Sequence, residues 1–272
     1  MEWILLIFLI IFIYYSYRYT WWKKTINYSY PRILMYHMIS EHKKKSKFNG
    51  LRVDPSLFEK QIKYLIDNNW SFYTMNELIE NKDTLAKKSI AITFDDGYED
   101  NFTNAFKILK KYNIKATIYL VVNRHNREWS SKRKAKNNDG ELMYEPKIKD
   151  SQVQEMIDSG LIEIASHTLT HDNLASISQK QKLDEICKSK EIIENTFNIK
   201  CDSFCYPFGI MDKEDWKIVK DANYTNATTT KKGIDDIKDV NPYLISRITI
   251  SGKDNFFTFK LKLKTGKRGI NK

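Results

Sequence analysis

Cysteine is scarce in this 272-residue sequence, which contains Cys187, Cys201 and Cys205 and no others. An odd number of cysteines excludes a fully paired disulfide framework of the kind that holds small secreted domains together. Cys201 and Cys205 lie four positions apart, but the sequence lacks a second cysteine pair that could complete a structural zinc site. We therefore expect buried or idle thiols, and the cysteines leave the redox compartment open.

Nucleic-acid-binding patterns, internal repeats and low-complexity tracts are also missing. Lys and Arg total 45 against 34 Asp and Glu, which gives a net charge of +11. Such an excess favours anionic partners, although most of these charges are typical of a solvated surface. Because neither a helix-turn-helix nor a zinc-finger pattern is present, we expect no nucleic-acid partner. The length and the 42% hydrophobic content suffice for one large domain.

The first 22 residues are predicted to form a membrane anchor. The segment Trp3–Tyr17 carries no charge. It reaches the roughly 20 residues of a membrane span if Arg18 snorkels and Trp21 and Trp22 lie in the interface. No small-residue cleavage site follows, so we expect an uncleaved single-pass transmembrane helix rather than a signal peptide. Residues 23–30 are read as a linker, and the small excess of positive charge on the domain side leaves the orientation open.

Predicted strands and helices alternate through the rest of the chain, residues 31–272, which we assign to one domain. The first of these helices begins at Asp54-Pro55, where proline suits the first helical position. Regular alternation predicts a parallel sheet with helices packed outside it, and at this length a distorted (β/α) barrel is the natural closure of such an α/β chain. The predicted strands are 32–36, 89–94, 116–122, 161–165, 203–206, 227–230 and 245–250.

Two segments are predicted to lie outside the packed core. Residues 123–149 are polar and basic and are interpreted as an exposed loop, longer than most loops, which can indicate a function. The tail from Lys260 is basic, and we expect it to fray.

Polar and titratable residues follow four of the predicted strands. The carboxyl ends of parallel barrel strands share one face, and active sites form on that face. The topology therefore predicts that residues far apart in the sequence meet there. They are His37, Asp95 and Asp96, His167 and His171, and the turn Pro207-Phe208-Gly209.

Each of these features has an ordinary structural explanation when taken alone. Adjacent acids before a glycine are common in turns. Two histidines four apart can be unrelated surface groups, and His37 can be a core histidine beside Tyr36. Three of the five histidines nevertheless fall at predicted strand ends, together with a double acid. We interpret this coincidence as a functional site.

Two imidazoles and one carboxylate are a common ligand set for a catalytic divalent metal. The pattern differs from the zincin motif, because Thr168 rather than a glutamate follows the first histidine. The general base must then come from elsewhere, and the second carboxylate of the Asp95-Asp96 pair is the obvious source.

Three motifs resemble those of the polysaccharide deacetylases, carbohydrate esterase family 4, whose domain is known by its NodB homology. They are Thr93-Phe-Asp-Asp-Gly97, Ser166-His-Thr-Leu-Thr-His171 and Tyr206-Pro-Phe-Gly209. The resemblance covers residues 31–250. It implies a distorted (β/α) barrel and the hydrolytic removal of acetyl groups from the nitrogen of a glycan.

The sequence departs from the commonest pattern of that family. No histidine occurs after His171, where a C-terminal motif usually supplies a catalytic one. Instead, Leu34-Met-Tyr-His37 precedes the double acid, which resembles the permuted branch that includes poly-N-acetylglucosamine deacetylases. The arginine frequent in the third motif is also missing. Arg247 is the candidate for this cation, and a purely structural role for it is equally compatible with the sequence.

The resemblance also implies a role for each residue. The metal ligands are Asp96, His167 and His171, and zinc is the expected ion. Asp95 is the general base, kept ionised by the metal or by Arg247. His37 protonates the leaving amine, and the backbone N–H of Phe208 donates to the oxyanion.

The sequence does not reveal which glycan is the substrate. Poly-N-acetylglucosamine, chitin-like oligomers, peptidoglycan and a lipid-linked precursor are all compatible with it, because sugar pockets depend on loop detail. A metallohydrolase of small amides would share the same ligands. A membrane-tethered glycan-binding or assembly protein without turnover is a further alternative, against which the intact set of acids and histidines argues.

Overall fold

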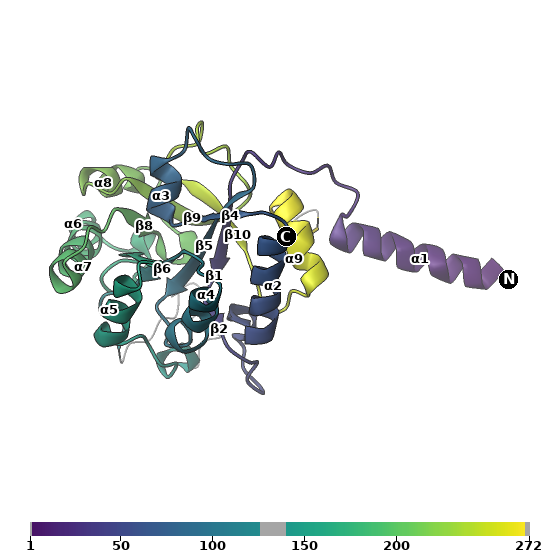
Figure 1. The fold of residues 1–272 in the computed structure, drawn as a ribbon, viewed down its shortest axis with the longest axis horizontal. Coiled ribbons are helices and arrows are strands. Elements are labelled where there is room, and N and C mark those ends of the chain that lie inside the picture. The colour runs from purple at the N-terminus through teal and green to yellow at the C-terminus, as the bar shows by residue number, and fades with distance from the viewer. Residues whose placement is uncertain (1, 126–139, 270–272) are drawn as a thin grey trace.

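The computed structural model describes residues 2–125 and 140–269, and it shows a closed barrel of seven parallel strands (Figure 1). Each strand pairs with its neighbour in parallel, and β1 closes the ring by pairing with both β10 and β5. The ring consists of β1 (Arg32–Tyr36), β5 (Ser89–Asp96), β6 (Ala116–Leu120), β7 (Ile162–Ser166), β8 (Ser203–Cys205), β9 (Asn226–Lys232) and β10 (Ile245–Thr249). All seven predicted strands are confirmed, with ends that differ by at most two residues.

Three short strands were not predicted from the sequence. Strand β4 (Ser71–Tyr73) pairs with the first residues of β5 outside the ring. Strands β2 (Met38–Ile39) and β3 (Arg52–Val53) form a separate parallel pair. Runs of two or three residues are too short to show the alternation that identifies a strand.

Successive side chains of β5 face opposite sides of the barrel wall. Ile90, Ile92 and Phe94 pack into the large hydrophobic cluster shared with the surrounding helices, whereas Ala91 belongs to a second cluster on the other face. Because side chains alternate along a strand, Asp95 lies on the same face as Ala91. The strand therefore carries Asp95 toward the barrel interior.

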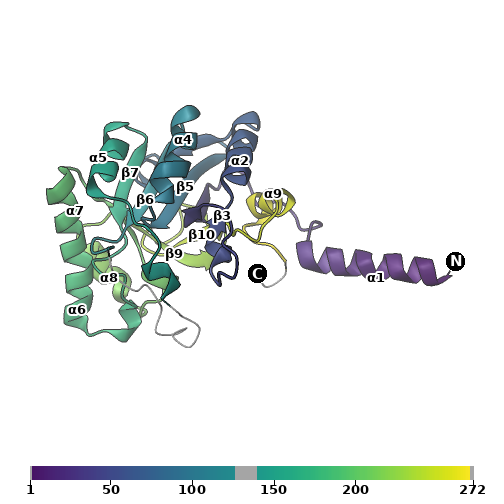
Figure 2. The ribbon, with the colours of Figure 1, turned by 90° about the horizontal axis from the view of Figure 1, so that it is seen from below.

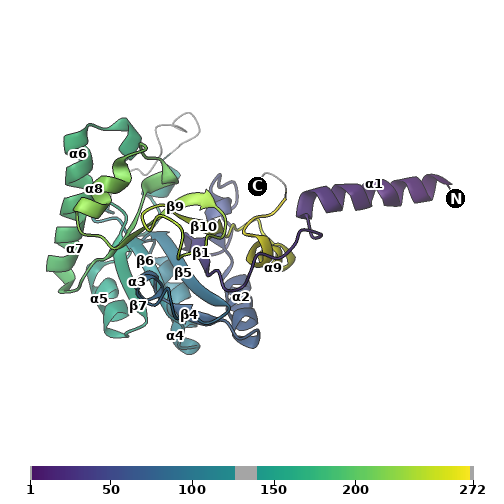
Figure 3. The same ribbon diagram turned by 90° about the horizontal axis from the view of Figure 1, so that it is seen from above.

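Helices surround the barrel, as the views from below and from above show (Figures 2 and 3). The predicted helix at Asp54-Pro55 is confirmed, because the Asp54 side chain caps it and Pro55 is its first residue. The α-helices of the barrel are α2 (Pro55–Asp67), α3 (Met75–Glu80), α4 (Lys107–Lys111), α5 (Asp150–Asp158), α6 (Gln179–Leu183), α7 (Ser189–Phe197), α8 (Asp215–Asp221) and α9 (Phe256–Thr265). There are also two π-helical segments. Segment η2 (Asn101–Phe106) leads directly into α4, and η6 (Asp184–Lys188) lies between α6 and α7. Short 3-10 turns are η1 (Asn49–Leu51), η4 (Glu141–Met143), η5 (Leu174–Ser176) and η7 (Pro207–Gly209).

The prediction of a frayed C-terminal tail is wrong. Residues 256–265 form α9, and its Phe259, Leu261 and Leu263 are buried against the domain. Lys262 is also buried, because its ammonium group donates to the Thr249 carbonyl at 2.7 Å and pairs with Asp254. The sequence predicted an exposed tail because Lys260, Lys262 and Lys264 alternate with the apolar residues that pack.

The prediction of an exposed loop at 123–149 is wrong for part of its length. Arg124, Leu142, Glu145 and Lys147 are buried, and Lys147 forms an antiparallel bridge with Tyr98. Charged side chains pack here because each has a partner, as when Arg124 donates to the Ile148 carbonyl at 2.6 Å. The central part of this segment, 126–139, lies outside the described residues.

Helix α1 (Glu2–Tyr19) projects away from the barrel (Figure 1). Its apolar side chains are exposed, and its last turn contacts α9 through Tyr19 and Phe257, whose ring centroids are 5.5 Å apart. Of the residues that the structure describes, none belongs to a helix with the length and apolar character needed to cross a membrane. The predicted transmembrane span at residues 1–22 is therefore not confirmed, because the uncharged run is short and Arg18 lies in the last turn of the helix.

Candidate metal centre and active site

Three buried side chains converge at the carboxyl end of the barrel. Asp96 ends β5, and His167 and His171 lie in the loop that follows β7. The Nε2 atoms of His167 and His171 are 3.4 and 3.2 Å from Oδ1 of Asp96, and the three ligand atoms lie within 4.8 Å of one another. Donors bonded to a tetrahedral zinc ion at about 2.0–2.1 Å lie about 3.3–3.4 Å apart. The arrangement thus fits a small divalent cation, as predicted.

A backbone contact fixes the orientation of the His167 ring. Its Nδ1 is 2.7 Å from the carbonyl oxygen of Cys205, so this nitrogen carries the proton and donates it. Nε2, which faces Asp96, is then the nitrogen left to lose its proton and bind a metal. Metal-binding histidines are commonly held by such a contact.

The backbone of this site adopts conformations that L-residues rarely take. The φ angles are 80° at Asp96, 69° at Thr168, 62° at His171 and 58° at Phe208. Left-handed φ values at non-glycine residues cost free energy and persist where the surrounding structure enforces them. Two of the three candidate ligands are among these residues, which indicates that the site's geometry is imposed rather than relaxed.

Electrostatics favour a charged carboxylate at Asp96. Burial by itself raises the pKa of Asp96, but the hydrogen bonds from His167 and His171 and their charges outweigh burial and hold the pKa well below its usual range. The groups that stabilise the anion are the two imidazoles. A bound cation supplies the same stabilisation without requiring the imidazoles to carry protons.

Asp95 forms a two-pronged ion pair with Arg247 of β10. The NH1 and NH2 nitrogens of Arg247 lie 2.6 and 2.7 Å from Oδ1 and Oδ2 of Asp95, and both side chains are buried. The guanidinium is oriented further by the Thr93 hydroxyl and the Thr229 carbonyl, each at 3.0 Å. Burial raises the pKa of Asp95, but the charge and hydrogen bonds of Arg247 more than compensate, so the net pKa is lowered. The predicted contact between Arg247 and Asp95 is thus present in the fold.

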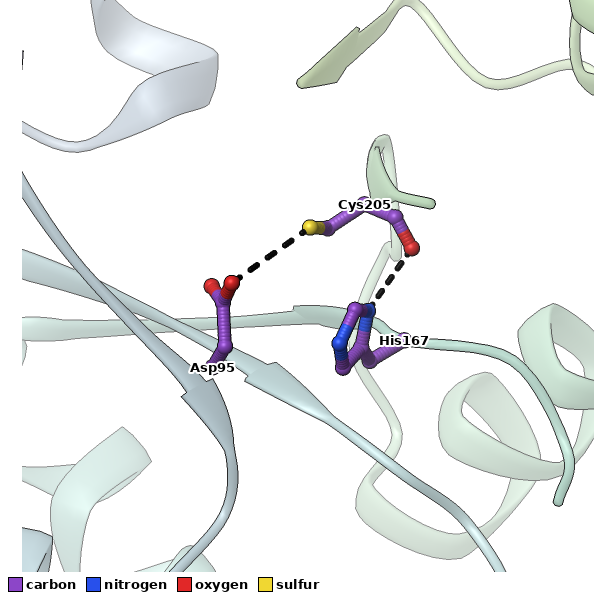
Figure 4. Close-up of side chains that lie close together, drawn as sticks. All are labelled: Asp95, His167 and Cys205. Carbon is purple, nitrogen blue, oxygen red and sulfur yellow. Dashed lines mark hydrogen bonds between the residues drawn. The ribbon is translucent and has the colours of Figure 1, made fainter. Parts of the chain in front are cut away.

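Cys205 contacts both halves of the site, whereas its sequence context predicted only a buried or idle thiol. Its carbonyl oxygen accepts a hydrogen bond from Nδ1 of His167, and its Sγ atom lies 3.8 Å from Oδ2 of Asp95 (Figure 4). The same sulfur is 3.0 Å from NH2 of Arg247. Its position on the strand just before Tyr206-Pro-Phe-Gly209 was the only signal that could have revealed it.

Asp95, His167 and Cys205 also lie within ligand distance of one another. The guanidinium of Arg247, however, already contacts both the carboxylate of Asp95 and the sulfur of Cys205. A cation placed among these groups would be repelled by a buried positive charge at close range. Asp96, His167 and His171 are therefore the group better suited to hold a metal.

His37 lies where β1 ends, beside β5, because Tyr36 pairs with Phe94. Its backbone carbonyl accepts a hydrogen bond from the Asn101 side chain at 2.7 Å. The imidazole is partly buried, and its charge lowers the pKa of both Asp95 and Asp96. The fold thus brings His37 to the two acids from the front of the chain.

Phe208 lies in η7, next to the metal ligands. Its ring meets that of His171 edge to face, with centroids 4.5 Å apart. The turn is tight, because a Cβ atom on Gly209 would lie 2.0 Å from the hydroxyl oxygen of Thr230. The Thr230 hydroxyl donates to the Phe208 carbonyl at 3.1 Å and holds the turn in place. The backbone of Phe208 is therefore fixed beside the candidate metal centre.

Fold and site together define a barrel hydrolase with a candidate metal centre and a buried acid. The family described as polysaccharide deacetylase matches residues 82–227. This protein therefore belongs to the polysaccharide deacetylase family, and it is an enzyme that hydrolyses amide bonds of acetylated polysaccharide.

Similarity to individual proteins extends over most of the chain. YxkH of Bacillus subtilis, whose name places it provisionally among the polysaccharide deacetylases, is 30% identical over 85% of this chain and 75% of its own length. The poly-β-1,6-N-acetyl-D-glucosamine N-deacetylase of Staphylococcus aureus is 29% identical over 77% of this chain and 71% of its own. A Bacillus cereus polysaccharide deacetylase of known structure is 28% identical, with a TM-score of 0.72 over 86% of this chain and 69% of that one.

Proposed function

We propose that this protein removes N-acetyl groups from a glycan resembling poly-N-acetylglucosamine, and that the reaction depends on a divalent metal, with zinc the expected ion. The observation that carries the proposal is the adjacency of two sites. Asp96, His167 and His171 form a fitting ligand set, and the buried Asp95–Arg247 pair lies next to it. The similarity to the Staphylococcus aureus enzyme supports the choice of glycan.

The metal would be held by Asp96, His167 and His171. A divalent ion at such a site lowers the pKa of a coordinated water and polarises the carbonyl of the acetyl group. These two effects address the difficulty of amide hydrolysis, which needs a strong nucleophile and an activated carbonyl.

Asp95 is the general base that removes a proton from the attacking water. Its lowered pKa keeps it ionised at neutral pH, so it is ready to accept a proton. Arg247 holds both carboxylate oxygens and so fixes the direction in which Asp95 can act. A low pKa makes Asp95 a weaker base, and the fixed position of its carboxylate compensates for this.

His37 and Phe208 complete the proposed chemistry. The backbone N–H of Phe208 donates a hydrogen bond to the oxyanion formed when water attacks the acetyl carbonyl. His37 then donates a proton to the departing amine nitrogen, because an unprotonated amine is a poor leaving group. The positions of both residues beside the metal ligands and the acids support these roles.

Acetate release by the full-length protein tests the proposal. The substrates are poly-N-acetylglucosamine, chitin oligomers, peptidoglycan and a small N-acetyl amide, each assayed with and without a chelator. We expect acetate from poly-N-acetylglucosamine, loss of activity with chelator and recovery on adding Zn²⁺. Asp95→Asn is the control for contaminating activity.

Each alternative function predicts a different result in this assay. Activity that resists the chelator contradicts the metal mechanism. Turnover of the small amide without any glycan identifies a small-amide hydrolase. Tight glycan binding with no acetate release from any substrate identifies a binding or assembly protein.

We also propose that α1 attaches the protein to a membrane. Its exposed apolar residues, with Trp21 and Trp22 at its foot, form a surface suited to lipid. The segment that follows the helix contacts the domain, since the Lys264 ammonium group donates to the Trp21 carbonyl at 3.0 Å. Flotation with phosphatidylglycerol vesicles should retain the full-length protein and release the Leu6→Asp, Ile10→Asp variant. Equal flotation of both proteins would contradict this attachment.

A further inference from the structure

We propose that Glu185 is a positioning residue for the metal centre, and that its carboxylate holds the loop bearing His171 in the shape that binds metal. This inference rests on the metal site of the proposed function. Glu185 lies in η6, does not reach the ligands itself, and is buried. Its role must therefore be exerted through the residues that it contacts.

Glu185 makes three hydrogen bonds to two consecutive residues of the ligand loop. Its Oε2 accepts the backbone N–H of Thr170 at 2.8 Å, and its Oε1 accepts the Thr170 hydroxyl at 2.6 Å. Its own backbone carbonyl accepts the N–H of Leu169 at 3.1 Å. Leu169 and Thr170 are two of the three residues between the histidine ligands, so the carboxylate fixes the middle of the loop.

The loop needs such a constraint because its conformation is strained. Thr168 and His171 both have left-handed φ angles, of 69° and 62°. Thr170 directly precedes His171, and the Thr168 hydroxyl accepts the His171 N–H at 3.0 Å. Strained backbone persists only where its surroundings over-determine it. Releasing Thr170 would let His171 turn away from Asp96.

The same helical segment also contacts the loop beside the first ligand. The Ser189 hydroxyl, at the start of α7, is 2.7 Å from the hydroxyl of Ser166, which accepts the backbone N–H of Thr168 at 3.3 Å. Helices α6 and α7 run as one rod at the side of the barrel, with η6 between them (Figure 2). A π-helical turn inside a helix often marks a functional site. Here the π-helical segment η6 supplies Glu185, which contacts the ligand loop.

Loss of the Glu185 contacts should weaken metal binding more than it changes the chemistry. Groups that orient metal ligands typically contribute about 10- to 100-fold in affinity. In Glu185→Gln the side chain keeps its size but loses its charge, so the stronger charge-assisted hydrogen bonds to Thr170 are lost, and its NH2 group can bond to the Thr170 hydroxyl only if that hydroxyl turns to accept. We expect zinc to bind this variant about 10- to 100-fold more weakly, with activity restored at saturating zinc.

The experiment measures zinc affinity of the metal-free full-length protein by competition with a chromophoric chelator. The visible spectrum of the Co²⁺-loaded protein gives an independent readout of ligand geometry, and we expect a shifted spectrum for Glu185→Gln. Glu191→Gln is the matched control, because Glu191 is an exposed acid on the adjacent helix α7. It should bind zinc as the wild type does.

A second pair of variants covers the case in which Glu185→Gln does not fold. Thr170→Val removes only the hydroxyl that donates to Glu185, and Thr170→Ser keeps it. We expect weaker zinc binding and an altered Co²⁺ spectrum for the valine variant, and wild-type behaviour for the serine variant. If folded Glu185→Gln, or in its place Thr170→Val, binds zinc with wild-type affinity and an unchanged spectrum, the proposal is overturned.

Metal binding is measured without any glycan, so the two proposals can fail separately. A wild-type protein that binds zinc in a Glu185-dependent way but releases no acetate would contradict the proposed function and leave this inference standing. A wild-type protein that binds no divalent metal would overturn both.

Discussion

Arg247 holds both carboxylate oxygens of Asp95, at 2.6 and 2.7 Å, across 152 positions of sequence. Both side chains are buried, so water cannot take the place of either one as the partner of the other. Such a pair orients the carboxylate of Asp95, but the loss of either partner leaves the other charge buried and unpaired. The first prediction concerns the consequence of removing one of them.

Arg247→Met should destabilise the protein by about 3–5 kcal/mol, because it leaves the Asp95 carboxylate buried without its cation. Urea unfolding at neutral pH measures the change. The control is Lys111→Met, which removes an exposed cation 2.8 Å from Glu59 and should cost no more than about 1 kcal/mol. Equal free energies of unfolding for the two variants would show that the buried pair contributes no more to stability than the exposed one.

Asp95→Asn and Asp96→Asn should separate catalysis from metal binding. The first variant should retain its metal and lose acetate release by about 10²- to 10⁴-fold, as expected for loss of a general base. The second should lose the metal, because the amide is a much poorer ligand than the carboxylate. Metal content after dialysis and acetate release measure the two effects. Substantial turnover by Asp95→Asn would remove Asp95 from the role of base.

His37→Ala should affect substrates according to their leaving group. Amide hydrolysis should fall by about 10²- to 10⁴-fold, because the amine must be protonated to depart. Hydrolysis of 4-nitrophenyl acetate should change little, because nitrophenolate leaves without a proton. The matched control is His42→Ala, which removes an exposed histidine five residues later. A uniform loss on both substrates would argue for a structural role of His37.

Asp100 gives a prediction about pH and stability. Burial is the main cause that raises the pKa of Asp100 from 3.8 to about 6, against the hydrogen bond from the Ile39 N–H. A carboxyl group with a higher pKa in the folded state is costly to the fold when ionised. The cost is therefore present above pH 6 and disappears as the pH falls from about 6 to about 4.

Asp100→Asn should remove this cost, while its side-chain oxygen can still accept the Ile39 N–H. A difference of about two pKa units corresponds to about 3 kcal/mol. The free energy of unfolding of the variant, relative to wild type, should thus fall by up to about 3 kcal/mol between about pH 7.5 and about pH 4. A difference that does not vary with pH would mean that the pKa of Asp100 is not raised.

Local patterns were sufficient to locate the seven strands and the three side chains that meet at the candidate metal centre. The strands are short apolar runs rich in branched residues; Asp95 and Asp96 end one of them, and the histidine pair follows another. The packed C-terminal helix α9 and the buried residues near Glu145 were missed, because lysines and glutamates normally mark solvent-exposed segments. Their burial depends on partners elsewhere in the chain.

The sequence by itself determined which residues stand at the carboxyl ends of the strands, because strand periodicity and the motifs are properties of neighbouring residues. Only the tertiary structure decided that Arg247 meets Asp95, that Cys205 touches both, and that Glu185 braces the histidine loop. Glu185 meets Thr170 across only 15 positions of sequence, whereas the Arg247–Asp95 contact joins β10 to β5 because β1 closes the ring between these two strands. No local pattern encodes that closure, since it arises from the packing of the whole barrel.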